Sequence, residues 1–394
     1  MQLVAYGAQD IYLTGNPQIT FFKVVYRRHT NFSMEAIPQV FDGTFGFGKT
    51  VVCTVPRNGD LVHRMYVKVQ VGTAFTADAD MRALLKSVEL EIGGQRIDKQ
   101  YYRWQVCWQD LTYNESQKNA MDVMAGLSAS SSTNDTYYLP LDFWFCRNPG
   151  CALPLIALQY HEVKVRVEID TLANMPGVQT AKTGPSAGTI SSGDLLVDYI
   201  YLDTDERRRF AQVSHEYLIE QVQFTGAESI SQGTSKSNKI NLHFNHPVKE
   251  LIWYYGAGNT GANTEVSYIN TAKLQLNGHD RFKEETGDYF AHVQRFQHHT
   301  GVGLTGSGAT KRADTLGDSD NGIGEGVYCY SFGLRPEEHQ PSGTCNFSRI
   351  DNAVLNLTTT TSSTSAGVSE VHVFAHSYNV LRVMSGMGGL AYSN

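Results

Sequence analysis

The sequence predicts an all-β protein made of two consecutive eight-stranded antiparallel jelly-roll sandwiches, a double jelly roll, with a few short helices in loops. Three observations support this: apolar and polar residues alternate along many short segments, clusters of Gly, Asn, Ser and Thr separate these segments, and one pattern occurs twice. At 394 residues the chain also exceeds the ~250–300 residues at which a single core usually stops growing.

The alternation is clearest in residues 65–71 and 163–169, and it recurs in residues 240–244 and 355–357. Side chains along a strand point to opposite faces of the sheet, so each segment is expected to have one buried and one wetter face. Short strands of this kind, broken by turn residues, are typical of antiparallel sandwiches.

Three segments of the first half resemble three segments of the second half. The pairs are Phe32–Ile37 with Tyr217–Val222, Val62–Val67 with Val248–Trp253, and Val88–Gly94 with Ala272–Gly278. The sequence numbers within these pairs differ by 185, 186 and 184, which keeps nearly one register. A solenoid repeat would recur every ~20–50 residues, so this spacing predicts a whole domain copied once.

In chain order the sequence predicts an N-terminal arm over residues 1–20, a first jelly roll over 21–210 and a second over 211–394. Helical periodicity is found at Gln109–Leu127 and at Asp288–His298, which occupy equivalent places in the two halves. Small-residue tracts predict exposed loops at Ser128–Thr133, Ala181–Gly193, Gly256–Thr264, Gly301–Gly308 and Thr358–Gly367.

Composition argues against several classes of protein. The net charge is −7, whereas a protein that mainly grips nucleic acid normally shows a basic face. The basic run Arg207–Arg209 follows acidic residues and is expected to be a solvated inter-domain segment. No apolar run approaches the ~20 residues of a membrane span, and no signal-peptide pattern is seen. Six cysteines without a CxxC pair predict reduced thiols in a protein made in the cytosol.

Several motifs resemble those that carry chemistry, but their surroundings favour other interpretations. Gly301–Gly306 matches GxGxxG, but it lies in a small-residue tract of an all-β chain rather than between a strand and a helix. His161-Glu162 does not extend to HExxH, because residue 165 is Val. His372 and His376 are expected to face the same solvent side of a strand, where metal binding is the less favoured interpretation.

Adjacent acids at Glu284-Glu285 and Glu337-Glu338 could serve a glycosidase, but acids in such Gly- or Pro-flanked segments are usually just solvated. We therefore predict that the chain is not an enzyme, with no catalytic, cofactor-binding or metal-binding residues and no cofactor. The chain has 21 Tyr and 18 Phe. About half of the aromatic side chains are expected in the core, and the others favour subunit interfaces, which are rich in aromatics and Arg.

Four stretches resemble the double jelly-roll major capsid proteins of nucleocytoplasmic large DNA viruses, and together they span nearly the full chain. They are Gly15–Phe32, Gly59–Tyr66, Arg335–Asp351 and Tyr378–Val383. The resemblance implies a major capsid protein that forms pseudo-hexagonal homotrimeric capsomers, which tile an icosahedral shell. Two similar barrels per chain, taken three times, would give the six similar barrels of a nearly hexagonal outline.

The resemblance also implies partners and a location. The partners are the protein itself, in trimers and in lateral contacts between capsomers, then minor capsid and penton proteins, and through them the inner viral membrane. Direct sequence-specific nucleic-acid binding is not expected. The location is the virion capsid, assembled in a virus factory in the host cytoplasm. The loop tracts would form towers or subunit contacts, and the N-terminal arm would lie toward the particle interior.

Two alternatives stay open from the sequence. A carbohydrate-binding or carbohydrate-cleaving double jelly roll would share the fold, because fold alone does not decide function. Such a protein predicts a monomer or dimer with saturable sugar binding, whereas a capsid protein predicts a tight trimer and further assembly. A minor vertex or spike protein is less favoured, because the resemblance to the abundant shell subunit covers the whole chain.

Overall fold

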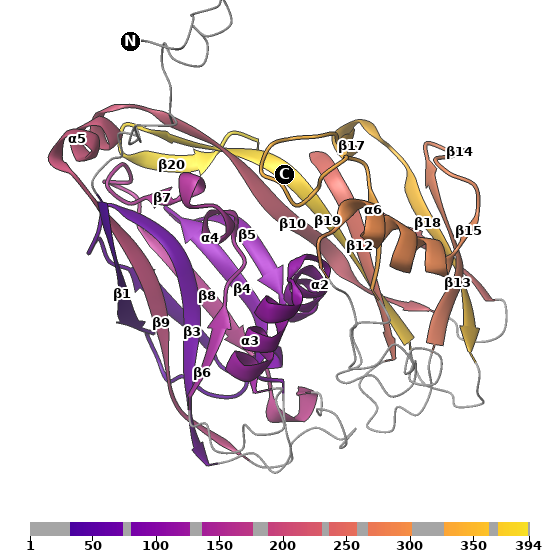
Figure 1. Cartoon of the computed structure of the whole chain (residues 1–394), viewed down its shortest axis with the longest axis horizontal. Helices are drawn as coiled ribbons and strands as arrows, with labels where there is room; N and C mark the ends of the chain where they lie inside the picture. The colour runs from indigo at the N-terminus through magenta and orange to yellow at the C-terminus, as the bar shows by residue number, and fades with distance from the viewer. Residues whose placement is uncertain are drawn as a thin grey trace, which may run out of the picture.

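Two groups of strands stand side by side in the computed structural model, and short helices lie between and in front of them (Figure 1). The structure describes residues 32–73, 80–126, 136–175, 188–230, 236–257, 267–301, 327–361 and 369–392. The strand pairs within these ranges are antiparallel, which confirms the predicted all-β class.

The first half forms two sheets that enclose a core. Its strands are β1 Phe32–Val40, β2 Thr50–Val55, β3 Leu61–Thr73, β4 Leu85–Ile92, β5 Gln95–Tyr101, β6 Thr136–Pro140, β7 Leu153–Pro154, β8 Val163–Ile169 and β9 Thr189–Leu202. One sheet has the order β1-β9-β3-β6, with β7 beside β3, and the other has the order β2-β8-β4-β5.

The second half repeats this arrangement. Its strands are β10 His215–Ile230, β11 Lys236–Asn241, β12 Pro247–Ala257, β13 Ser267–Leu276, β14 His279–Asp280, β15 Glu285–Thr286, β16 Val327–Ser331, β17 Cys345–Asn346, β18 Ala353–Thr361, β19 Ser369–Met384 and β20 Met387–Leu390. The sheet orders are β10-β19-β12-β16 and β11-β18-β13-β14. Strand for strand, these orders match those of the first half, whereas the predicted number of eight strands per sandwich stays a prediction.

The halves also share their irregularities. β3 slips against β9 between Val62 and Met65, and β12 slips against β19 between Val248 and Glu250. In both places one extra residue stands in the inner strand, which is a β-bulge that re-aims the side chains beside it. Because Val62 and Val248 are also paired in the sequence comparison, the matching bulges confirm the repeat predicted from the sequence.

The pairing corrects one of the three predicted offsets. Across β9, Ile37 lines up with Met65, and across β19, Gln223 lines up with Leu251. Ile37 therefore corresponds to Gln223, an offset of 186, and the predicted 185 was wrong by one residue. Chemical similarity along an edge strand does not fix its register, whereas the hydrogen-bonded pairing does, and a one-residue slip moves every side chain to the other face.

Helices occupy the connections between strands. They are η1 Met81–Leu84, α2 Tyr102–Thr112, α3 Glu115–Ala125, α4 Trp144–Arg147, η3 Pro149–Cys151, η4 Leu172–Asn174, α5 Thr204–Gln212, η5 Tyr289–Val293, α6 Gln294–His298 and η6 Phe347–Arg349. Among the described helices, none is long and apolar enough to cross a membrane. The predicted helices at Gln109–Leu127 and Asp288–His298 are confirmed in kind.

The predicted start at Gln109 was seven residues late. α2 begins at Tyr102 and is buried on nearly every side, so it shows no amphipathic stripe by which to recognise it. α3 does carry sequence signals: Asn114 and Gln117 form a capping box, and Gly126 ends the helix with a φ of 81°. α5 was not predicted, and its run Arg207–Arg209 is exposed as expected.

Three of the predicted loop tracts begin or end in strands. Residues 189–193 belong to β9, residues 256–257 to β12 and residues 358–361 to β18. Small and polar residues there predict loops, but the backbone pairing of long strands extends through the Ser and Thr residues of β9 and β18. Apart from Gly188, the rest of these three tracts lies outside the described residues. So do Ser128–Thr133, most of Gly301–Gly308 and the N-terminal arm.

The hairpin of β19 and β20 returns to the first half. Ile219, Leu381 and Val383 belong to the first-half core cluster rather than to that of the second half. The hairpin lies on this core so closely that a Cβ on Gly388 would stand 2.6 Å from Leu158. The two sandwiches are therefore joined by packing as well as by the chain between them.

Candidate functional site

Helix α2 of the first half fills the junction between the halves. Trp104 and Trp108 stack with their ring centroids 5.5 Å apart, and Trp104 meets the edge of Phe374 at 5.7 Å. Val222 and Ile252 belong to the same buried cluster. The outer face of the sheet β10-β19-β12-β16 is thus covered by the first half of the same chain.

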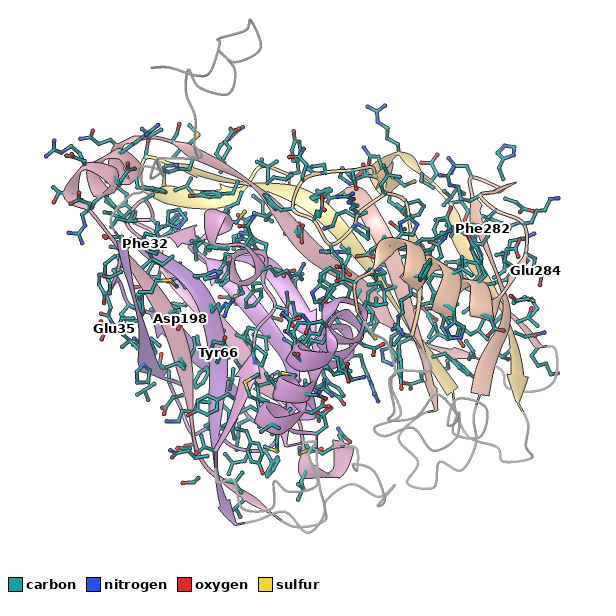
Figure 2. All side chains as sticks on the ribbon, viewed as in Figure 1. Phe32, Glu35, Tyr66, Asp198, Phe282 and Glu284 are labelled. Carbon is teal, nitrogen blue, oxygen red and sulfur yellow. The ribbon has the colours of Figure 1, made fainter. Side chains whose placement is uncertain are left out.

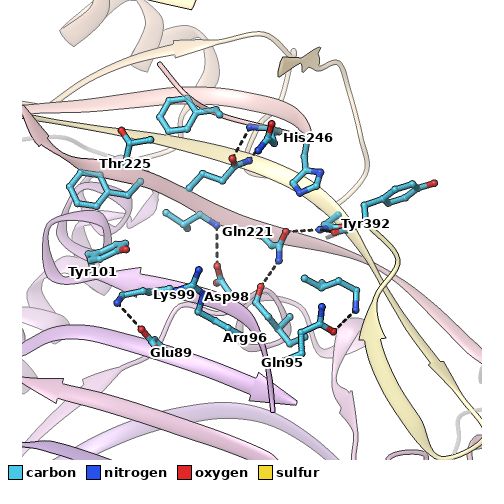
Figure 3. Close-up of a pocket in the computed structure, with 18 of the residues that line it drawn as sticks. Glu89, Gln95, Arg96, Asp98, Lys99, Tyr101, Gln221, Thr225, His246 and Tyr392 are labelled. Atoms are coloured by element: carbon cyan, nitrogen blue, oxygen red, sulfur yellow. Dashed lines mark hydrogen bonds and ion pairs between the residues drawn. The ribbon is translucent and has the colours of Figure 1, made fainter. Parts of the chain in front are cut away.

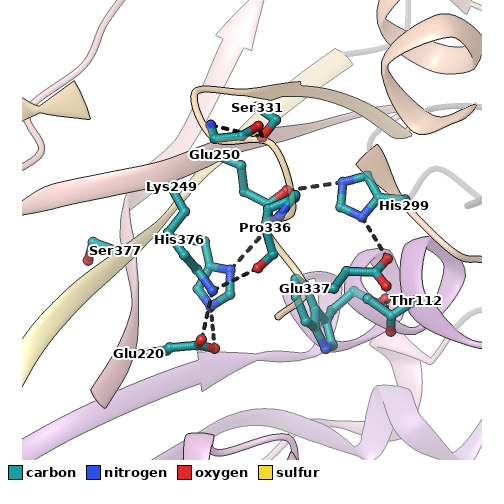
Figure 4. A network of polar contacts seen from close by, with 12 residues as sticks. Thr112, Glu220, Lys249, Glu250, His299, Ser331, Pro336, Glu337, His376 and Ser377 are labelled. Carbon is teal, nitrogen blue, oxygen red and sulfur yellow. Dashed lines mark hydrogen bonds and ion pairs between the residues drawn. The ribbon is translucent and has the colours of Figure 1, made fainter. Parts of the chain in front are cut away.

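Beside this apolar contact, the bulge in β12 directs two charged side chains into the interior (Figure 4). The Lys249 ammonium donates to Glu220 Oε1 at 2.7 Å and to the Pro336 carbonyl at 2.8 Å. Glu250 Oε1 lies 3.0 Å from Nδ1 of His376, and its Oε2 lies 3.0 Å from Nε2 of His299. These charged groups are almost fully shielded from solvent.

The first half contributes a cation to this network. Arg147 of α4 donates to Glu220 Oε2 at 2.8 Å, and its guanidinium lies 4.3 Å from the ring centroid of Trp108. His376 Nε2 is 3.2 Å from the same carboxylate oxygen. Charged groups from both halves therefore meet at Glu220, which makes the junction specific in geometry as well as apolar.

The pKa values at Glu220 reflect this pairing. Burial alone raises the pKa of Glu220, but Lys249, His376 and Arg147 outweigh it and hold that pKa well below its usual range. Burial lowers the pKa of Lys249, and the Glu220 carboxylate opposes that shift. The carboxylate is ionised at neutral pH and compensated by cationic and hydrogen-bonding partners.

The other branch of the network joins two carboxylates through one histidine. Burial lowers the pKa of His299, but Glu250 and Glu337 raise it well above the usual value. Its Nδ1 lies 3.0 Å from Glu337 Oε1, so a protonated His299 bridges Glu250 and Glu337. Burial raises the pKa of Glu250, and His299 and His376 more than offset this. The arrangement is a buried ionic lock in which each of these carboxylates has a partner.

The structure answers the sequence predictions for this region. His372 and His376 do share one face of β19, as predicted, but the first half covers that face, so His376 is buried and His372 is half-buried. Strand periodicity fixes which residues share a face and says nothing of what packs on it. Glu337 belongs to the buried network, while Glu338 pairs at the surface with Arg335.

The remaining candidates lie apart from one another. His161 Nδ1 contacts the Gly388 carbonyl at 2.9 Å, which is a packing contact with the C-terminal hairpin. Glu284 and Glu285 are exposed at the far side of the second half. Gly301 donates its backbone N–H to Leu111, and the rest of the GxGxxG match lies outside the described residues. Within the described residues, no cluster of three His, Cys, Asp or Glu could hold a metal ion.

The network was missed at the level of sequence, although a signal was present. Lys249 and Glu250 interrupt an otherwise apolar strand, and charged neighbours inside such a run mark a bulge or a buried ion pair. Their partners are Glu220, His299 and His376, which are far apart in the chain. Only the fold brings these residues together.

A polar groove of about 600 Å³ lies where β5 meets β10 (Figure 3). Asp98 Oδ1 accepts the Val222 backbone N–H at 3.1 Å, and Lys99 pairs with Glu89 at 2.6 Å. Burial raises the pKa of Asp98 to about 6, against the lowering effect of its hydrogen bonds and of Arg147. The contacts across the groove tie the two halves together and supply no nucleophile with a base.

Exposed apolar side chains occur on several elements, and two pairs of them lie on β1 and on the η5–α6 segment. Phe32 and Met34 of β1 are 62% and 48% exposed, and Val293 and Phe296 of η5 and α6 are 40% and 89% exposed. In Figure 2 the first-half face around Phe32 lies at one end of the molecule, and the side of the second half near Phe282 lies at the other. Such apolar surface is a mark of protein contacts.

Comparison with known proteins agrees with this picture of a structural subunit. Residues 20–203 match the family described as major capsid protein N-terminus, and residues 206–307 and 322–389 match the family described as large eukaryotic DNA virus major capsid protein. The major capsid protein of Pyramimonas orientalis virus is 54% identical, with 100% of this chain and 99% of that protein covered. That of Paramecium bursaria Chlorella virus 1 is 43% identical with the same coverage.

Solved structures show the same fold. A chain of the PBCV-1 virus capsid superimposes with a TM-score of 0.79 and 36% identity, covering 95% of this chain and all of that chain. The Faustovirus major capsid protein, at 12% identity and a TM-score of 0.73, shares the fold. The double jelly roll, the buried junction and these relatives identify a capsid subunit and not an enzyme, and the chain belongs to the family of major capsid proteins of large eukaryotic DNA viruses.

Proposed function

We propose that this chain assembles into homotrimeric capsomers with a nearly hexagonal outline, and that these capsomers tile the icosahedral shell of a large double-stranded DNA virus. The observation that carries the proposal is the identical sheet order of the two halves. Three copies then supply six similar barrels around one axis, and a nearly hexagonal object packs edge to edge. Closed cyclic symmetry holds the trimer, and smaller lateral contacts join trimers.

The domain division follows from the same duplication. We propose an arm over residues 1–20, a first jelly roll over 21–210 and a second over 211–394. Helix α5, which connects β9 to β10, supports a boundary near residue 210. The two family matches, which end at residue 203 and begin at residue 206, support it as well.

Partners and location complete the proposal. Minor capsid and penton proteins bind the assembled capsomers, and contact with an inner viral membrane runs through them. Assembly takes place in the host cytoplasm, in a virus factory. Sequence-specific binding of nucleic acid is not part of the function, a view that the net charge of −7 supports.

Native mass tests this proposal. One chain has a mass of 43.7 kDa, and light scattering of the purified protein should give three times that mass, unchanged on dilution. Concentrated trimer should then form hexagonally packed patches that electron microscopy can resolve. A stable 43.7 kDa monomer at all concentrations would overturn the capsomer.

A further inference from the structure

Arg103 is the second residue of α2, the helix that lies where the two halves of the chain meet (Figure 1). Its guanidinium lies 5.2 Å from the ring centroid of Tyr102 and 5.0 Å from that of Tyr254. Tyr102 belongs to the first half and Tyr254 to the second, so an aromatic ring of each half holds this cation. The side chain is half-buried, which shields its charge from much of the solvent.

No acid neutralises Arg103 within the described ranges of the chain. Lys249, which lies farther along the same junction, pairs with Glu220 at 2.7 Å, whereas Arg103 forms no ion pair or hydrogen bond with any described residue. Asp80 contributes to the field at Arg103, but its carboxylate is bound by Arg82 at 2.8 Å. The first turn of α2 contains no acidic residue either. The charge of this guanidinium therefore lacks a counter-charge in direct contact.

The contacts of Arg103 also leave its hydrogen-bond donors unused. Aromatic rings attract a cation through their quadrupole, but they supply no oxygen lone pairs to its N–H groups. The five donors of a guanidinium form a planar fork that suits two oxygens of one anion. The rings of Tyr102 and Tyr254 thus fix the position of the fork and leave it available to a ligand.

His372 of β19 places a second protonatable group beside this cation. Its ring centroid lies 6.1 Å from that of Tyr254, and it stacks on Phe224 at 5.6 Å. Burial lowers the pKa of His372, and the charge of Arg103 lowers it further, to about 4. Glu370 lies 3.7 Å from the imidazole and is 41% exposed, so it does not compensate this effect. The imidazole stays neutral at pH 7 because the positive field has no counter-charge.

We propose that Arg103 and His372 form a binding site for a small oxyanion of the phosphate or sulfate class, at the contact between the two halves. The guanidinium binds two oxygens of the anion. The negative charge of the anion then favours a proton on His372, which donates a hydrogen bond to a third oxygen. Because the two side chains come from different halves, the bound anion ties the halves together. The site lies within one chain, so this inference does not depend on the trimer.

Sulfate is the probe for the test, because it keeps its charge over the whole pH range of the titration. The pKa of His372 is measured by NMR of the full chain labelled with isotopes in histidine, and His372→Gln assigns its signal. Sodium chloride at equal ionic strength is the reference, which accounts for general screening. We expect sulfate to raise the pKa of His372 by about 1. The unfolding temperature should rise with it, since the anion binds only the folded chain.

Three variants separate binding from general ionic effects. Arg103→Gln removes the cation, so the pKa of His372 should rise without sulfate and should not respond to it further. Arg103→Lys keeps the charge and loses the planar fork, so the pKa should start low and sulfate should bind more weakly than in the wild type. Arg349→Gln changes an exposed arginine of η6 and is the matched control, which should behave as the wild type. Thermal unfolding checks that each variant is folded.

Two results would overturn the site. If the pKa of His372 does not respond to sulfate, or responds equally in the wild type and in Arg103→Gln, sulfate acts only as a salt. If Arg103→Gln leaves the pKa of His372 unchanged without sulfate, a carboxylate of the chain already neutralises Arg103. Neither result bears on the mass of the native assembly, so the proposed capsomer stands or falls separately.

Discussion

Buried charges dominate the junction at the scale of single residues. Glu220, Lys249 and Glu250 are all removed from water, and each is compensated by oppositely charged or hydrogen-bonding groups. A buried ion pair is weak evidence for stability in itself, because desolvation offsets much of the attraction. Its consequence is geometric: a sandwich packed in another orientation would leave these charges unpaired. We infer that the network fixes how the second half sits on the first.

Replacing His299 with Gln tests this interpretation. The variant removes the imidazolium that bridges Glu250 and Glu337 and leaves a buried carboxylate with one histidine. We expect the free energy of unfolding to fall by about 3–5 kcal/mol at pH 6. Because the pKa of His299 is raised in the folded state, its contribution is complete below its unfolded pKa and is lost as pH rises through the folded pKa. The difference should therefore shrink at alkaline pH.

Urea unfolding followed by tryptophan fluorescence provides the measurement. The matched control is Arg335→Gln, which breaks a surface pair with Glu338 whose side chains are 72% and 54% exposed. That change should cost less than about 1 kcal/mol. If His299→Gln behaves like this control, the buried lock does not stabilise the junction.

At the scale of elements, α2 is the segment on which the two halves depend most. It lies in the first half by sequence, yet its large side chains pack on strands of the second. Trp104 is fully buried, and its indole N–H has no hydrogen-bond partner among the described residues. The ring therefore acts through apolar contact alone.

Two substitutions at Trp104 separate these effects. Trp104→Ala leaves a cavity beside Trp108 and Phe374 and should lower the free energy of unfolding by about 3–5 kcal/mol. Trp104→Phe keeps an aromatic ring and removes the unpaired N–H, so it should stay within about 1.5 kcal/mol of the wild type. Denaturant titration measures both. Equal losses for the two variants would show that the full indole ring is needed here and that a smaller aromatic ring does not preserve the packing.

The sequence predicts the strands better than it predicts which elements pack against them. Apolar and polar residues alternate over residues 163–169, which form β8 with the same bounds. The alternation is visible because the side chains of a half-buried strand point in turn to the core and to the solvent. Periodicity does not predict the bounds of α2, because this helix is buried on nearly every side and has no polar face. The histidines of β19 were placed on the correct shared face with the wrong environment, because the covering helix comes from a distant part of the chain.

At the scale of the whole molecule, two junction residues give stability opposite dependences on pH. Burial and then Arg103 lower the pKa of His372 to about 4, and the exposed Glu370 at 3.7 Å does not reverse this. Its contribution is present above pH 6.5 and is lost as pH falls toward 4. Burial raises the pKa of Asp98 to about 6, so its contribution is lost as pH rises from 3.8 toward 6.

Single variants should separate these opposing dependences. Residue 372 lies beside the rings of Phe224 and Tyr254. As pH falls from 6.5 to 4, the free energy of unfolding of His372→Phe should rise relative to that of the wild type by on the order of 2–3 kcal/mol. Asp98→Asn removes the stabilisation that the wild type gains when Asp98 is protonated, so the free energy of unfolding of this variant should fall more steeply as pH decreases. Unfolding free energies measured at half-unit pH steps give the comparison, and curves parallel to the wild type in both variants would contradict the assignment.

The duplicated architecture was open to prediction because two copies of one domain keep their turns and bulges. Gly93-Gly94 and Asn277-Gly278 both turn the chain between matching strands, and this supported the correct offset of 184. The relation between the halves was not open to prediction. It depends on Ile219 and Leu381 of the second half entering the core of the first, and side-chain alternation says nothing of which core receives them.

That exchange of core residues has a consequence for synthesis on the ribosome. The first sandwich emerges from the exit tunnel early, but Leu381, Val383 and the β20 hairpin that complete its core are translated after every other described strand. N-terminal domains generally fold first and as units during synthesis. Here the first domain must wait, with part of its core open, until β19 and β20 have emerged. We therefore expect that chains ending before β19 leave the cores of both halves incomplete and do not assemble.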